Sequence, residues 1–156
     1  MTDPLHIRKA THDDAPTISA LILSLAHHFL LNAHGSGAEA FLFALQPEGI
    51  ERYIASPEID YHVGMLGDVL AGVVAVRRRT HLFHLFVGAS FQNRGHATTL
   101  WTHAKTTCGW PSDAMPTTVN STPFAMPFYE RLGFRATGPR VETNGIAFVP
   151  MQLGAD

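Results

Sequence analysis

The stretch FQNRGHATTL, residues 91–100, places Gly95 between Arg94 and His96, where a loop is expected to become a helix. The first amide groups of a helix have no internal acceptor and lie at its positive pole, so they attract anions. Gly95 leaves no Cβ between a phosphate and the backbone, and Ala97 keeps the next turn small. The stretch therefore indicates an anion-binding helix start. An ordinary turn with a glycine before a helix fits the same residues, so the surrounding elements must separate the two interpretations.

The elements around this stretch alternate between strand and helix patterns. Runs of β-branched and aromatic residues separated by turn-prone pairs predict three successive strands, over 60–67, 69–79 and 80–88. The strand over 80–88 is apolar on both faces, so we expect it to be central and buried. Downstream, the pattern predicts a helix over 94–110 ending at Gly109, a strand over 116–120, a helix over 122–134 ending at Gly133 and a last strand over 145–153.

The first third of the chain has mainly helical spacing. An extended piece over 5–11 precedes a helix over 12–30, with Asp13 or Asp14 as its cap and Pro16 in its first turn. Residues 35–58 predict a helix that is interrupted around Pro47 and Gly49. The resulting order, βα(α)βββαβαβ, predicts a single α/β domain over residues 1–156, a central mixed β-sheet flanked by helices. We expect its last strand to be the edge at which a homodimer would form.

Composition excludes several classes of protein. The chain has 156 residues, 46% of them apolar, and a formal charge of −2 with only 11 Lys and Arg. There is no basic excess, so nucleic acid and membrane surfaces are not expected partners. Cys108 is the only cysteine, which rules out an internal disulfide and fits a cytoplasmic, unprocessed protein. Neither the phosphate-binding pattern Gly-x-x-x-x-Gly-Lys-Ser/Thr nor Gly-x-Gly-x-x-Gly occurs, so NTP and dinucleotide folds are disfavoured.

Two motifs resemble one known family. Residues 92–97, QNRGHA, are similar to the Gln/Arg-x-x-Gly-x-Gly/Ala motif of the GCN5-related N-acetyltransferase (GNAT) superfamily, and they follow LFHLFV, which resembles that family's fourth strand. VNSTPFAMPFYERLGFRATG, residues 119–138, looks like the family's strand-five asparagine and its Phe-Tyr-Glu-x-x-Gly-Phe ending. The resemblance is strong over 60–136 and weak over 35–57, where family members build their acceptor sites.

The resemblance implies a GNAT-like fold and acetyl-CoA as cosubstrate. In that superfamily the glycine loop holds the pyrophosphate of acetyl-CoA, and the pantetheine arm lies where the fourth and fifth strands splay apart. A main-chain amide near Val87 would stabilise the negative oxygen of the intermediate. The residues implied to bind the cosubstrate are Phe86, Val87, Gln92, Asn93, Arg94, Gly95, His96, Ala97, Thr98 and Asn120. Asn120 has a second interpretation, as the cap of the following helix.

Acetyl transfer to an amine needs a proton acceptor and a proton donor. Tyr129 matches the family's general acid, which returns a proton to the leaving thiolate; the alternative is a packed aromatic residue. His81 lies where some relatives carry a carboxylate base, and histidine can accept a proton near neutral pH; the alternative is a polar strand-end residue. Four other histidines are equally available without an assigned role: His27, His28, His62 and His84.

Metal chemistry is not expected. The ten histidines come with no cysteine cluster and no zinc-type His-x-x-x-His helix, and the adjacent pair His27–His28 diverges on a helix. Arg77–Arg79 is typical of a solvated turn, with contact to the 3′-phosphate of CoA as the alternative.

The resemblance implies an N-acetyltransferase that uses a primary amine of a small molecule or peptide, by direct attack in a ternary complex. Two alternatives share the same motifs. One is a non-catalytic acyl-CoA sensor or regulatory domain, and the other is an O-acyltransferase or longer-chain acyltransferase.

Overall fold

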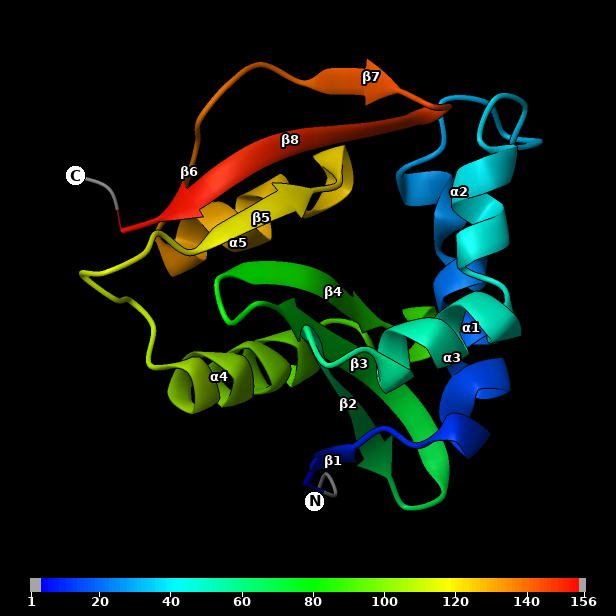
Figure 1. Ribbon diagram of the computed structural model, residues 1–156, viewed down its shortest axis with the longest axis horizontal. Coiled ribbons are helices and arrows are strands. Elements are labelled where there is room, and N and C mark those ends of the chain that lie inside the picture. Colours follow the sequence, from blue (N-terminus) through cyan, green and yellow to red (C-terminus); the bar gives the residue numbers. More distant parts are fainter. Residues whose placement is uncertain (1–3, 155–156) are drawn as a thin grey trace.

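The computed structural model describes residues 4–154, whose core is one eight-stranded mixed sheet. The strand order is β1-β2-β3-β4-β5-β8-β6, and β7 also pairs with β8 (Figure 1). β4 and β5 are parallel, and all the other pairs are antiparallel. The strands are β1 (His6–Lys9), β2 (Ile59–Leu66), β3 (Val69–Arg77), β4 (His81–Val87), β5 (Thr118–Ser121), β6 (Phe134–Ala136), β7 (Val141–Thr143) and β8 (Ile146–Leu153).

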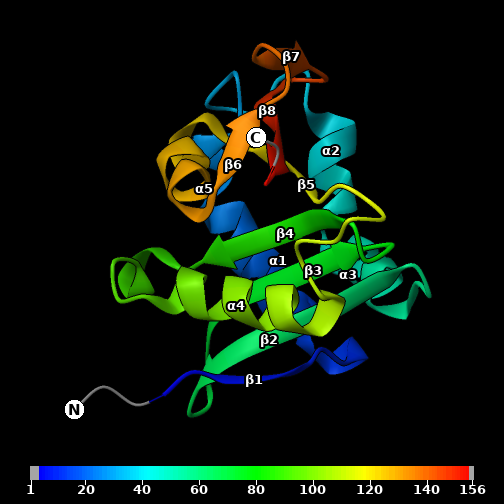
Figure 2. The same cartoon turned by 90° about the vertical axis from the view of Figure 1, so that its left-hand side faces the viewer.

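Helices cover both faces of this sheet. Alternate residues of β3 point to opposite faces, so Val73 and Ala75 pack in a cluster with α1 and α3, while Val74 and Val76 pack beneath α4. Figure 2 shows α4 across one face of β2–β4, with α1 and α3 behind the sheet. The α-helices are α1 (Ala15–Ser24), α2 (Glu39–Ala44), α3 (Pro47–Ala55), α4 (His96–Cys108) and α5 (Met126–Leu132). Short 3₁₀ turns are η1 (His12–Asp14), η2 (Ala26–His28), η3 (Ala89–Phe91) and η4 (Pro123–Ala125).

The sheet opens between β4 and β5. Only two residue pairs join these strands, His81 with Thr118 and Leu82 with Val119. Beyond Leu82, β4 follows β3 while β5 follows β8, so the two halves of the sheet diverge (Figure 1). The backbone of β4 from residue 83 onward therefore has no partner strand on its β5 side.

Most predicted elements are confirmed. The predicted fold class is correct, and the three successive strands form the β2–β3–β4 meander. The helix expected over 94–110 is α4, which ends at Gly109 in the left-handed conformation (φ 71°). The prediction of one helix over 12–30 is too long. The helix α1 ends at Ser24, and the 3₁₀ turn η2 follows it. The carboxylate of Asp14 caps the preceding turn η1: it accepts a hydrogen bond from the Thr11 amide at 2.7 Å. The same carboxylate forms a salt bridge with Arg8 at 2.8 Å.

The interrupted helix over 35–58 is two helices, but the break lies earlier than expected. It falls between α2 and α3, and Pro47 begins α3 because a first-turn proline loses no helical hydrogen bond. Gly49 lies inside α3, so the prediction of a break there is wrong. A Cβ on Gly49 would overlap the Ala44 carbonyl, which explains why a glycine occupies this helical position.

The last strand is not an edge, so the expected dimer edge is wrong. β8 has β5 on one side and β6 and β7 on the other, which leaves β1 and β6 at the ends of the strand order. β6 and β7 have only three residues each, too few to show a strand period in the sequence. No helix within residues 4–154 has the length and apolar character needed to span a membrane.

Candidate active site

The start of α4 has the geometry expected of an anion site. Gly95 precedes the helix with φ 83° and ψ 4°, a left-handed conformation, and a Cβ placed on it would meet nothing within 4 Å. The first helical hydrogen bond runs from the Thr99 amide to the Gly95 carbonyl at 3.0 Å. The amides of residues 96–98 therefore have no acceptor within the helix. They lie at the positive end of a 13-residue helix, beside open space.

A cavity of about 390 Å³ lies against this helix start. Its walls come from β4, the glycine loop, the start of α4, β5, η4 and α5, so it follows the opening between the two halves of the sheet. Ten of the twelve residues predicted from the sequence line it: Phe86, Val87, Gln92, Asn93, Gly95, His96, Ala97, Thr98, Asn120 and Tyr129. The fold brings these residues together from parts of the chain up to 43 positions apart, Phe86 to Tyr129. His81 and Arg94 do not line this cavity.

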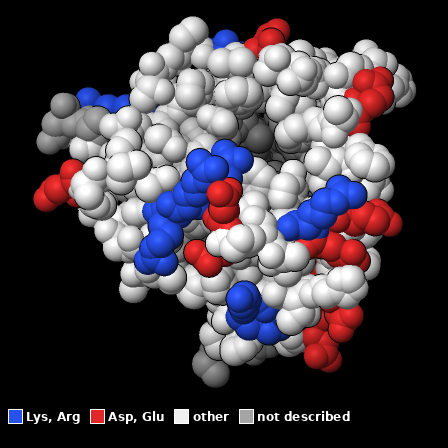
Figure 3. Space-filling view, viewed as in Figure 1, with Lys and Arg blue, Asp and Glu red and all other residues white. Residues whose placement is uncertain are grey.

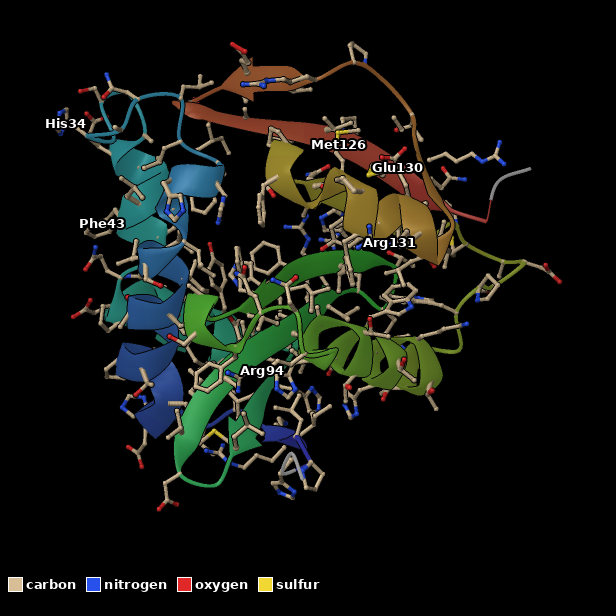
Figure 4. All side chains as sticks on the ribbon, turned by 180° about the vertical axis from the view of Figure 1, so that it is seen from behind. His34, Phe43, Arg94, Met126, Glu130 and Arg131 are labelled. Carbon is tan, nitrogen blue, oxygen red and sulfur yellow. The ribbon has the colours of Figure 1, made fainter. Side chains whose placement is uncertain are left out.

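The loop before α4 is tied to the end of β4. The side-chain amide of Gln92 donates to the Val87 carbonyl at 2.9 Å, and Asn93 adopts φ 64°, a conformation that asparagine tolerates. His96 is buried, and its Nε2 has no hydrogen-bond partner within residues 4–154. Arg94 is exposed on the loop that leads into α4 (Figure 4).

The Val87 amide faces the opening between the strands. The amide of the next residue, Gly88, donates to the Ala71 carbonyl at 2.9 Å, toward the β3 side. Neighbouring residues of a strand direct their amides to opposite edges, so the Val87 amide points to the β5 side, where pairing has already ended. An unpaired main-chain donor thus faces the cavity wall.

Tyr129 is held by aromatic packing, with its hydroxyl group unpaired. Its side chain is only 5% exposed, and its ring lies 5.2 Å from that of Phe128 and 5.5 Å from that of Phe134, centroid to centroid. Within the described chain its hydroxyl has no hydrogen-bond partner, although the residue lines the cavity. Burial raises the pKa of Tyr129 above its ordinary value, so the phenol keeps its proton at neutral pH.

The capping role considered for Asn120 belongs to Thr122. The Thr122 hydroxyl accepts from the Ala125 amide at 3.1 Å, and this bond begins the 3₁₀ turn that leads into α5. Asn120 is exposed and lines both this cavity and a second one. It therefore lies where the two cavities meet.

The second cavity, of about 270 Å³, contains His81 and His84. It shares Phe83, Phe86, Asn120 and Thr122 with the first cavity. The Nδ1 of His81 lies 2.8 Å from the Thr118 hydroxyl, and burial, followed by the charge of Arg77, lowers the pKa of His81 to about 4. The same two causes lower the pKa of the fully buried His84 to about 3, and its Nδ1 lies 2.8 Å from the Tyr61 hydroxyl. Both histidines are neutral at pH 7.

The buried His84 makes folding stability depend on pH. Its pKa is about 3 in the folded state and about 6.5 when unfolded, so below pH 6.5 the unfolded state binds the extra proton. Stability is then lost as pH falls. We expect His84→Phe to reduce the loss between pH 7 and pH 5 by roughly 1–2 kcal/mol, measured by urea unfolding at both values. Replacing the exposed His34 by Phe is the control, and equal slopes in all three proteins would contradict a neutral, buried His84.

Sequence reasoning missed Arg131 and Phe124 and assigned no role to His28; all three residues line the first cavity. Arg131 projects from α5 toward the space above β4, while Glu130 lies on the other side of that helix (Figure 4). The sequence feature that could have indicated Arg131 is its position on the same short helix as Tyr129, two residues later. The His28 and Phe124 rings stack at 3.9 Å with planes 17° apart, which joins η2 to η4. No sequence pattern links these two residues, since they are 96 positions apart.

The basic run Arg77–Arg79 lies at the turn between β3 and β4. Arg78 pairs with Glu58 at 3.3 Å, and Arg79 donates to the Thr107 carbonyl at 2.7 Å. None of the three lines the first cavity, so the alternative of a 3′-phosphate contact is not supported. Within residues 4–154 no three His, Cys, Asp or Glu side chains are grouped so that they could hold a metal ion.

The chain matches the sequence profile described as "Acetyltransferase (GNAT) domain" over residues 29–155. No curated protein matches the sequence. Among solved structures, the fold is similar to that of a GCN5-related N-acetyltransferase from Rhodopseudomonas palustris, with a TM-score of 0.79 and 20% identity over 99% of this chain and 98% of that one.

Two further similar structures contain a coenzyme. PaiA N-acetyltransferase from Thermoplasma acidophilum, in complex with coenzyme A, has a TM-score of 0.74 and 14% identity over 97% of this chain and 99% of that one. YncA, a putative acetyltransferase from Salmonella typhimurium with its cofactor acetyl-CoA, has a TM-score of 0.68 and 16% identity over 99% and 95%. The profile match covers most of the sequence, and the glycine loop at the start of α4 lies within it. The chain belongs to the GNAT acetyltransferase family.

Proposed function

We propose that this protein is an acetyl-CoA-dependent N-acetyltransferase, which acetylates a primary amine of a small molecule or peptide by direct attack in a ternary complex. The observation that carries the proposal is the pair of cavities that meet at the gap between β4 and β5. One cavity has the unpaired amides of α4 in its wall, and the other contains His81. Donor and acceptor can thus enter from different sides and meet at Asn120 and Phe86.

The first cavity fits the donor. The open space beside Gly95 admits a diphosphate to the amides of residues 96–98, and the exposed Arg94 adds positive charge nearby. Arg131 lines the opposite wall, on α5. The unpaired backbone of β4 beyond Leu82 offers hydrogen bonds to the amide groups of a pantetheine arm, as a partner strand would.

The residues around the gap supply the chemistry of transfer. His81 is uncharged at pH 7 and can take the ammonium proton of the acceptor through water, although burial and the charge of Arg77 make it a weaker base than a free imidazole. The amine nitrogen then bonds to the thioester carbon, and the Val87 amide donates to the carbonyl oxygen as it becomes negative; a fixed donor of this kind contributes about 3 kcal/mol. The carbon–sulfur bond breaks and Tyr129 gives its proton to the departing sulfur. The tyrosinate takes the second proton from the former amine nitrogen through water, and His81 returns its proton to solvent, so the products are the N-acetyl amide and the free CoA thiol.

We expect His81→Gln to lower kcat at pH 7 by about 100-fold, because general-base catalysis contributes 10²–10⁴-fold. The loss should shrink toward pH 10, since a free alkyl amine becomes neutral by itself near that pH. In the wild type, protonation of His81 should reduce kcat only as pH falls toward 4. The measurement is kcat at saturating acceptor across pH. A loss of equal size at every pH would show that His81 only positions the acceptor.

The proposal is tested by titrating acetyl-CoA into the protein in a calorimeter and by following CoA thiol release over a panel of primary amines. Binding together with amine-dependent release supports it. Binding with no release on any amine indicates the sensor alternative, and release only with alcohols indicates an O-acyltransferase. Absence of binding overturns the proposal.

A further inference from the structure

The second cavity, like the first, is lined by aromatic side chains and by one arginine. Six of its lining residues are Phe or Tyr: Phe29, Phe41, Tyr53, Phe83, Phe86 and Phe148. They come from the residue after η2 and from α2, α3, β4 and β8, so several separate parts of the chain contribute to one aromatic enclosure. Phe41, Leu45 and Tyr53 in this wall belong to residues 35–57, the region where the sequence resembles its family least.

These rings are fixed by contacts with one another. Phe29 meets Phe41 edge to face at 5.4 Å, and Tyr53 meets Phe83 in the same way at 4.9 Å. Edge-to-face pairs hold ring faces and edges in set directions, which favours a flat apolar guest over a flexible chain. The volume, about 270 Å³, is close to the lower end of the range for small-molecule pockets.

Arg77 is the single Lys or Arg among the lining residues, and no Asp or Glu lines the cavity. Its guanidinium lies 5.1 Å from the centre of the Phe83 ring, and within residues 4–154 it forms no salt bridge. The positive charge of Arg77 acts on side chains in the cavity, because it contributes to the lowered pKa values of His81 and His84. In the space-filling view this face of the molecule is hollowed, and basic side chains lie at the edge of the hollow (Figure 3).

The charge pattern selects against polycations. A second ammonium group in this cavity would lose water without gaining a carboxylate partner, and it would be repelled by Arg77. A carboxylate at the same place would gain a bidentate, charge-assisted partner. The aromatic walls would take up a ring, and the amine would reach the gap at Asn120.

We propose that the acceptor is a primary amine carried on an aromatic body together with a carboxylate, of the class of the aromatic amino acids, with Arg77 binding the carboxylate. This inference rests on the proposed function for the reaction, but its binding part is independent of turnover. Arg77 then determines specificity, while the six rings bind the apolar part of the acceptor.

The test compares matched acceptors. Phenylalanine and phenethylamine differ only by the carboxylate, and spermidine represents the polycations. We expect kcat/KM to fall in the order phenylalanine, phenethylamine, spermidine, with at least a tenfold step for loss of the carboxylate. Arg77→Gln should lower the ratio of kcat/KM for phenylalanine to kcat/KM for phenethylamine at least tenfold, mainly through the KM for phenylalanine.

Arg78→Gln is the matched control, because Arg78 is the next residue, is also exposed and lies outside both cavities. Arg78→Gln should leave kcat/KM unchanged for both phenylalanine and phenethylamine. The same contrast is expected when phenylalanine is titrated calorimetrically into the protein saturated with CoA, so the inference can be tested without catalysis.

The outcomes separate the two proposals. Turnover that prefers spermidine, or an Arg77→Gln effect of equal size on phenylalanine and phenethylamine, overturns the acceptor class and leaves the acetyltransferase intact. Arg77-dependent binding of phenylalanine without any acetyl transfer supports the ligand class and overturns the proposed reaction. Absence of both binding and turnover for aromatic amino acids overturns the inference.

Discussion

Replacing Gly95 by valine is expected to raise the KM for acetyl-CoA by at least about 100-fold. The space beside Gly95 is open, and a valine side chain would fill it in front of the amides of residues 96–98. A 100-fold loss corresponds to about 3 kcal/mol, roughly the contribution of one or two hydrogen bonds to a charged group. Initial rates at varied acetyl-CoA give the KM, and calorimetry gives the affinity for CoA itself.

The other end of α4 provides the control. Gly109 is also left-handed, with φ 71°, and a Cβ there would likewise meet nothing within 4 Å. Valine at either position imposes comparable backbone strain, on the order of 1–2 kcal/mol, but Gly109 does not line the cavity. Gly109→Val should therefore lose similar stability in urea and keep the wild-type KM within twofold. Equal KM values in the two variants would remove the start of α4 from the donor site.

The fold was predictable where local patterns are long and regular. Each of the three strands before the glycine loop is at least seven residues long, so its apolar pattern is easy to recognise. Gly109 and Gly133 end their helices as expected. Prediction failed for short elements and for pairing partners. β6 has three residues, too few for a period, and the central place of β8 depends on β5 and β6, which the sequence of β8 does not encode.

Most residues that line the first cavity were predictable because many of them are continuous in sequence. The glycine loop supplies successive residues, so its motif carries both identity and geometry. The second cavity depends on tertiary contacts that no sequence motif indicates. His84 belongs to β4, which mixes buried and half-buried residues, and only the fold shows that it lines a second cavity with Arg77. The same holds for Arg131, whose direction from α5 decides its place in the donor cavity.

Tyr129→Phe is expected to lower kcat by about 100-fold or more while the affinity for CoA stays within twofold. The substitution removes only a hydroxyl group, and that group has no hydrogen-bond partner within the described chain, so folding loses nothing through it. Burial keeps the phenol protonated, which is the form that a proton donor needs. General-acid catalysis contributes 10²–10⁴-fold, so its loss should be visible in kcat alone.

Tyr61→Phe is the control that shows whether the loss of kcat is specific to Tyr129. Tyr61 is also buried, but its hydroxyl pairs with His84 Nδ1 at 2.8 Å and it lines neither cavity. Tyr61→Phe leaves a buried nitrogen unpaired, which costs about 1–3 kcal/mol of folding stability, and should change kcat only a few-fold. Tyr129→Phe should show the opposite result: unchanged folding stability and a strongly lowered kcat. If Tyr129→Phe turns over at the wild-type rate, the departing sulfur takes its proton from water, and the buried phenol serves only the packing of α5.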